Sequence, residues 1–108
     1  MTATFGARAV HHVGITVPDL DAAVAFFRLL LETEPLGIEH HDRVRFLEQI
    51  TGYEDLALRV AFFEAPGNGV LLELIEYLRP AGRPQDPETY NIGNSHVSFH
   101  VTDIDAEF

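Results

Sequence analysis

The stretch that decides the fold is Val10–Leu31, VHHVGITVPDLDAAVAFFRLLL. Its first half alternates, with Val13, Ile15 and Val17 on one face and the residues between them on the other. A period of two is typical of a strand with one buried face. We therefore expect a strand here that turns its apolar side toward the core and His12 toward the opposite side.

The second half of the stretch predicts an α-helix that begins after Asp19. Aspartate is a favoured N-cap, and Asp21 adds a negative charge in the first turn, where it suits the helix dipole. Apolar residues then recur at the spacing of one helix face, at Leu20, Val24, Phe27 and Leu31. The strand should thus pass directly into a helix that folds back over its apolar face.

A similar stretch returns near the end of the chain. Residues 96–106 align with residues 12–22, and six of the eleven positions are identical: His, Val, Val, Asp, Asp and Ala. Both copies start a predicted strand with a histidine on the face opposite the helix, which indicates a duplicated strand–helix unit. Since the second copy stops early, we expect further sequence or a second chain to complete it, and we expect a homodimer.

Three segments together resemble the vicinal oxygen chelate superfamily, which includes glyoxalase I, methylmalonyl-CoA epimerase, extradiol dioxygenases and bleomycin-resistance proteins. They are HHVGITVPDLDAAVAFF (11–27), VLLELIEYLRPAG (70–82) and GNSHVSFHVTDIDA (93–106). The pattern is closest to glyoxalase I and methylmalonyl-CoA epimerase-like proteins. The resemblance implies an α+β fold of paired βαβββ modules around a metal-centred cleft, with the second module truncated in this chain.

The chain divides into four expected segments. They are a tail over 1–8, a first βαβββ module over 9–79, a linker rich in Pro and Gly over 80–94, and the start of a second module over 95–108. Within the first module, the sequence predicts strands over 36–41, 58–64 and 70–77. It also predicts a short helix with Asp42 as its cap and Gly52 just past its end.

Composition narrows the chemistry. The formal net charge is −10, which argues against a nucleic-acid partner because phosphate binding needs a positive surface. The chain has no cysteine, so disulfides and thiolate ligands are excluded, and no lysine, so Schiff-base chemistry is excluded. No apolar run is long enough to span a membrane. We expect a cytoplasmic protein with a small-molecule substrate.

His12, Glu73 and His96 form the predicted metal site. Glu73 interrupts the apolar strand VLLELI, and a buried carboxylate needs a partner. Two imidazoles and a carboxylate suit Zn, Ni, Co, Mn or Fe(II), so the expected cofactor is a divalent metal ion. The resemblance implies that each of the three matches a metal position of glyoxalase-like enzymes. The family's fourth ligand, a Glu on the last strand of the second module, has no counterpart here.

Other polar residues are assigned secondary roles. Thr16 and His100 share the strand faces of His12 and His96, and we expect them to contact the substrate. His40 and His41 are assigned to a solvated loop, and His11 to the strand edge or helix side. For Glu48, a solvated helix carboxylate is favoured over an acid or base, and Glu76 lies on the opposite strand face from Glu73.

The resemblance and the ligand set favour a metal-dependent isomerase, epimerase or lyase. In that chemistry a metal binds vicinal oxygens of the substrate and stabilises an enediolate, while a carboxylate moves the proton next to the carbonyl. An extradiol ring-cleaving dioxygenase is one alternative, although those enzymes take their carboxylate from the last strand of the second module. A metal-free binding protein of the bleomycin-resistance type is the other.

Overall fold

The computed structural model of the chain describes residues 5–67 and 69–107, so part of the predicted tail, residues 1–4, lies outside the described residues. Its elements are β1 (His12–Thr16), α1 (Leu20–Leu31), β2 (Gly37–Asp42), α2 (Arg45–Thr51), β3 (Ala57–Glu64), β4 (Leu71–Arg79) and α3 (Ile104–Glu107). This is the predicted α+β class. None of the described helices has the length and apolar character needed to cross a membrane.

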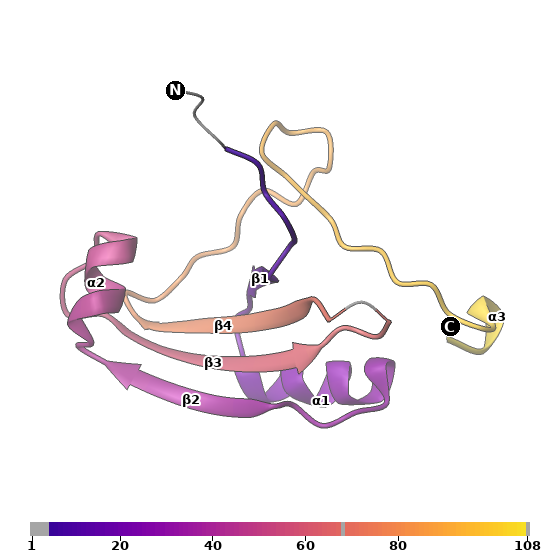
Figure 1. Ribbon diagram of the computed structural model, residues 1–108. Helices are drawn as coiled ribbons and strands as arrows, with labels where there is room; N and C mark the ends of the chain where they lie inside the picture. The colour runs from indigo at the N-terminus through magenta and orange to yellow at the C-terminus, as the bar shows by residue number, and fades with distance from the viewer. Residues whose placement is uncertain (1–4, 68, 108) are drawn as a thin grey trace.

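The four strands form one sheet in the order β1-β4-β3-β2 (Figure 1). β1 runs parallel to β4, whereas the β2–β3 and β3–β4 pairs are antiparallel. A parallel pair needs a long crossover connection, and the chain from α1 to β3 supplies it. The order and directions are those of one βαβββ module.

α1 covers one face of this sheet and builds the main core there. Leu20 and Val24 are buried on the helix, and Phe63 and Leu74 are fully enclosed on β3 and β4. Five residues of the opening stretch pack against this core: Ile15, Val17, Ala23, Phe27 and Leu31. The predicted apolar faces of strand and helix are therefore confirmed, and the alternate residues of each strand point to the other side of the sheet.

The ends of α1 follow from local chemistry. The Asp19 carboxylate accepts a hydrogen bond from the backbone N–H of Ala22 at 3.1 Å, which confirms it as the N-cap. The backbone N–H of Leu20 donates to Glu76 Oε1 at 2.7 Å, so a carboxylate of β4 satisfies another free donor of the first turn. Glu76 thus lies on the helix side of the sheet, as predicted.

The start of α2 differs from the prediction. Val44, not Asp42, is its N-cap residue, and no side chain caps it. Asp42 is instead the last residue of β2, and its Oδ1 accepts a hydrogen bond from Arg79 Nη2 at 2.6 Å. Pairing with β3 extends the strand by one residue and brings this carboxylate to the arginine. Gly52 ends the helix in the left-handed conformation, as predicted.

A second, smaller apolar cluster lies on the sheet face that α1 leaves uncovered. Leu56, Leu58 and Val60 are buried there, with Phe62 and Ile75 partly buried against them. Leu47 of α2 packs on the same cluster, which ties the short helix to this face. The face opposite α1 therefore has an apolar floor and, at one end, a helical wall.

The C-terminal part of the chain differs most from the sequence prediction. Residues 82–94 contain no helix or strand, consistent with a linker, but the strand expected from His96 onward is wrong: residues 95–101 are extended without pairing into a ladder. Phe99 packs on α1, with its ring centroid 6.3 Å from that of Phe27. α3 follows where the second helix was predicted. That this segment starts a second module stays a prediction.

Candidate functional site

The candidate site is a cavity of about 600 Å³ over the sheet face opposite α1. Its apolar lining comes from α2 with the residue before it and from the strands β3 and β4: Val44, Phe46, Leu47, Ile50, Leu58, Val60, Phe62, Ile75 and Tyr77. Four titratable side chains share it: His12, Glu39, His41 and Glu73. Such a mostly apolar pocket with a few polar groups is the usual form of a small-molecule site.

His12 and Glu73 meet at one end of this cavity. His12 opens β1, and Glu73 pairs in register with Gly14 on β4, so both side chains point away from α1. His12 Nε2 lies 4.0 Å from Glu73 Oε1. A Cβ on Gly14 would stand 3.4 Å from that same oxygen, so the glycine leaves room for the carboxylate beside the imidazole. The structure brings these two residues together, and that they bind a metal stays a prediction.

The imidazole of His12 is hydrogen-bonded through Nδ1 to the imidazole of His11. The two Nδ1 atoms are 2.8 Å apart, which is a hydrogen bond in which one ring donates and the other accepts. The rings meet edge-on at an interplanar angle of 86°. Because Nδ1 of His12 is engaged in this way, Nε2 is the nitrogen left to face the cavity. The expectation that His11 lies at the strand edge is consistent with this position.

Glu39 and His41 correct the sequence prediction. The sequence pattern assigns His41 to a solvated loop and gives Glu39 no role, but both residues belong to β2 and line the same cavity as His12 and Glu73. His41 Nε2 lies 2.9 Å from Glu39 Oε2, and the His41 side chain is 29% exposed. His40, between them, points to the other face and is exposed. The i, i+2 spacing of Glu39 and His41 was the available signal, once β2 is accepted as a strand.

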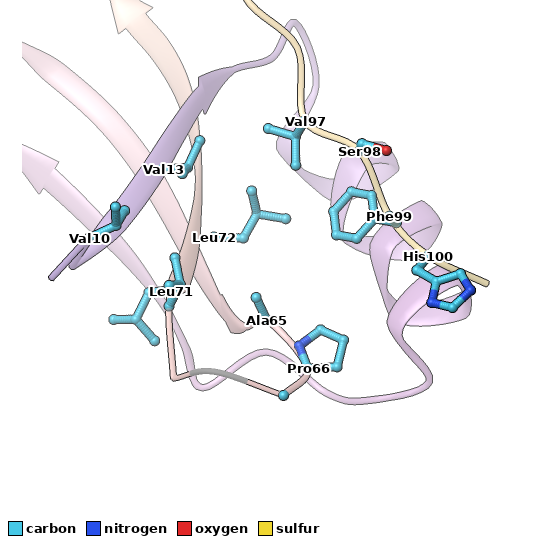
Figure 2. Close-up of a pocket in the computed structure, with 12 residues that line it drawn as sticks. Val10, Val13, Ala65, Pro66, Leu71, Leu72, Val97, Ser98, Phe99 and His100 are labelled. Atoms are coloured by element: carbon cyan, nitrogen blue, oxygen red, sulfur yellow. The ribbon is translucent and has the colours of Figure 1, made fainter. Parts of the chain in front are cut away.

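His96 lies away from this cavity. It is exposed on the C-terminal segment, and it does not line the pocket of His12 and Glu73. His100 lines a different cavity of about 590 Å³, between β1, the β3–β4 turn and the C-terminal segment, where Figure 2 shows it beyond Phe99. Thr16 lines a third pocket near the start of the linker. Thr16 and His100, the two predicted substrate contacts, therefore do not line the candidate site.

The remaining candidate carboxylate, Glu48, has a structural partner. Its Oε2 accepts a hydrogen bond from the backbone N–H of Leu56 at 3.2 Å. This bond fixes the loop between α2 and β3, so Glu48 is neither a freely solvated carboxylate nor a group of the cavity lining.

The residues present suit part of a metal site. Because metal–nitrogen and metal–oxygen bonds are about 2.0–2.2 Å long, the two donor atoms, now 4.0 Å apart, would have to move closer together to bind one tetrahedral ion. Imidazole and carboxylate together match borderline divalent ions. Across the described ranges 5–67 and 69–107, no group of three or more His, Asp or Glu is gathered closely enough to hold a metal. His12 and Glu73 would therefore supply two donors to such an ion, and the described residues gather no third beside them.

Comparison with known families agrees with the fold. The model of the glyoxalase/bleomycin resistance protein/dioxygenase superfamily matches residues 11–108, and the chain belongs to this superfamily. A glyoxalase family protein from Bacillus cereus has a similar solved structure, with a TM-score of 0.76 at 23% identity over 98% of this chain and 71% of that chain.

The sequence is also similar to a curated enzyme. It is 37% identical over 103 residues to a 2-epi-5-epi-valiolone epimerase from an Actinomyces species. The match covers 94% of this chain but 56% of the relative, so the chain spans a little over half the length of that protein.

Proposed function

We propose that this protein is a metal-dependent epimerase or isomerase of the glyoxalase type, acting on a small molecule with vicinal oxygens. The observation that carries the proposal is the His12–Glu73 pair, an imidazole and a carboxylate 4.0 Å apart at the wall of an otherwise apolar cavity. The epimerase among its relatives supports this reaction class and makes 2-epi-5-epi-valiolone the first substrate to test.

Three residues are proposed as metal ligands: His12, Glu73 and His96. The chemistry that a divalent ion supplies when bound is Lewis-acid polarisation of a substrate carbonyl, which makes the neighbouring C–H acidic. His12 would bind through Nε2, since its Nδ1 is hydrogen-bonded to His11. Placing His96 beside the other two requires the C-terminal segment to lie across the sheet rather than along α1.

The rest of the cavity would position the substrate. Val60, Phe62 and Ile75 form an apolar floor beside Glu73, which excludes water from the reacting carbon. Gly14 keeps the space above Glu73 open. Epimerisation then needs removal and return of a single proton at the carbon next to the carbonyl.

The test is an assay of the protein with 2-epi-5-epi-valiolone in deuterium oxide, followed by NMR. We expect an epimerised product with deuterium at the inverted carbon, loss of turnover on treatment with EDTA, and recovery with a divalent metal. Glu73→Gln should lower kcat/KM by about 100-fold or more, because it removes one of few ligands. Glu54→Gln, in the exposed loop after α2, is the matched control and should leave the rate unchanged.

Two results would replace the proposal. Oxygen uptake with a catechol that is unaffected by Glu73→Gln would indicate a ring-cleaving dioxygenase. Tight ligand binding that survives chelation, with no turnover of any substrate offered, would indicate a binding protein.

A further inference from the structure

The cavity has a second polar end that the proposed metal chemistry does not use. Glu39 and His41 lie on β2, while Glu73 lies on β4, so one whole strand separates the two pairs. Two strand spacings place β2 and β4 about 10 Å apart, a distance that one small molecule can bridge. Between the two ends the floor is apolar, with Val60 of β3 at its centre.

The Glu39–His41 pair presents hydrogen-bond acceptors to this space. His41 Nε2 and Glu39 Oε2 are bonded to each other at 2.9 Å. If the imidazole is neutral and donates through Nε2, its Nδ1 is an acceptor, and the second carboxylate oxygen of Glu39 is another. Both atoms can accept a hydrogen bond from a ligand. An alcohol O–H is the uncharged donor that most small oxygen-bearing metabolites carry.

The lining of this cavity contains no arginine among the described residues. Four arginines are paired with carboxylates elsewhere: Arg28 binds Glu34, Arg59 binds Asp21, and Arg43 and Arg79 bind Asp42. Arg45 of α2 lies between the lining residues Val44 and Phe46 but does not itself line the cavity. Two carboxylates, Glu39 and Glu73, face the space instead. A phosphate or carboxylate on the ligand would meet repulsion here rather than a partner.

The walls indicate the shape of the ligand. Phe46, Phe62 and Tyr77 line the cavity along with aliphatic side chains. Aromatic and aliphatic walls suit the C–H faces of a ring, while polar groups at two ends suit oxygens on its rim.

We propose that Glu39 and His41 bind a hydroxyl group on the far side of an uncharged, hydroxylated ring compound whose near side lies at His12 and Glu73. The inference rests on the proposed function in taking His12 and Glu73 as the metal end, and it adds the substrate class and two specificity-determining residues. The hydroxyl donates to His41 Nδ1 or to Glu39, and no covalent step is involved.

The test uses two probes and needs no metal. myo-Inositol is an uncharged hydroxylated ring, and inositol 1-phosphate is its anionic ester. Titration of each into the protein in EDTA, followed by NMR, should show that inositol binds at least tenfold more tightly than the phosphate. His41→Ala and Glu39→Gln should each weaken inositol binding about tenfold, the effect of losing one hydrogen bond to a polar or charged group.

His40→Ala is the matched control, since it removes the same residue type from the same strand on the opposite face. It should leave inositol binding unchanged, and urea unfolding should show that all three variants fold as the parent does. Absence of inositol binding, equal or tighter binding of the phosphate, or an equal loss in His40→Ala would overturn the inference. The same variants should keep their metal affinity, whereas failure of the unmodified protein to bind metal would count against the proposed function alone.

Discussion

Two regions of this chain share a sequence pattern and differ in structure. Residues 12–22 form β1 and the first turn of α1, and β1 pairs in parallel with β4 from His12 to Thr16. Residues 96–106 carry six identical positions, yet they are extended without a ladder until α3 begins at Ile104. The helix forms in both copies, but the strand forms in only one.

The difference shows which part of the pattern is local. A helix satisfies its own backbone, so an aspartate cap and a few residues suffice to start one. A strand must find its hydrogen bonds on a neighbour, and β4 provides them for the first copy only. Alternation thus predicts which faces a strand would have, while the partner decides whether the strand exists.

The largest expected effect concerns the two equivalent histidines. If His12 and His96 both bind the proposed metal, His12→Ala and His96→Ala should each lower its affinity by about 100-fold or more, since each removes one of few ligands. Isothermal titration with Zn²⁺ or Ni²⁺ would measure it. If His12→Ala loses metal affinity and His96→Ala keeps it, the two histidines are not equivalent, and only the first copy of the repeat contributes a metal ligand.

A second matched pair concerns packing. Leu20, the first residue of α1, is fully buried, whereas its counterpart Ile104 is 62% exposed. Leu20→Ala should therefore lower the free energy of unfolding by about 3 kcal/mol through lost burial and a cavity. Ile104→Ala should change it by less than about 0.5 kcal/mol, as is usual for exposed sites. Urea denaturation followed by circular dichroism measures both, and similar losses would show that the second copy is packed after all.

The cap residues provide a third comparison. Asp19 caps a helix of 12 residues and Asp103 precedes one of four, where its Oδ1 accepts from the backbone N–H of Asp105. Asp19→Ala should cost about 1 kcal/mol of stability. Asp103→Ala should cost clearly less, because among the described residues α3 packs against no other helix or strand. Thermal unfolding of the two variants would decide, and equal shifts in Tm would contradict the distinction.

The smallest expected effect concerns the Asp21–Arg59 ion pair and the stability of the fold at low pH. The hydrogen bond and charge of Arg59 lower the pKa of the Asp21 carboxyl below its ordinary value. The pair therefore stabilises the fold above about pH 4 and loses that contribution as the pH falls through the lowered value. Arg59→Gln should raise the pKa of Asp21 toward the ordinary range, as measured by NMR titration.

The matched variant in the other copy is Asp105→Asn, which should leave the acid-side unfolding curve unchanged because α3 lies off the sheet. An unchanged Asp21 titration in Arg59→Gln would show that the ion pair does not form in solution.

Most of the first module was predictable because its signals are local. The alternation of β1, the cap at Asp19 and the apolar stripe of α1 each fix a face without knowledge of the rest of the chain. β2 was assigned weakly, since Gly37–Asp42 contains one aliphatic residue and two histidines. Its existence depends on pairing with β3, which no local pattern records.

The site was predictable to the same extent. His12 and Glu73 were found because each breaks an apolar pattern at a position whose face is known. Glu39 and His41 could not be recognised as cavity residues from the sequence, because the strand pattern of β2 is weak and its adjacent histidines suggest a solvated loop. The position of His96 could not follow from sequence, since it depends on where an unpaired segment lies.

The pairing of β1 with β4 also has a consequence for the order in which the module assembles. β3 and β4 are joined by a short turn, so their ladder closes a small loop, whereas β1 must wait for a partner that the chain supplies only after α1, β2, α2 and β3. Because long loops cost more entropy to close, we expect β1 to dock after the hairpin has formed. Substitutions on β3 and β4 should then slow refolding more than Ile15→Val on β1, and equal φ-values in stopped-flow experiments would exclude this order.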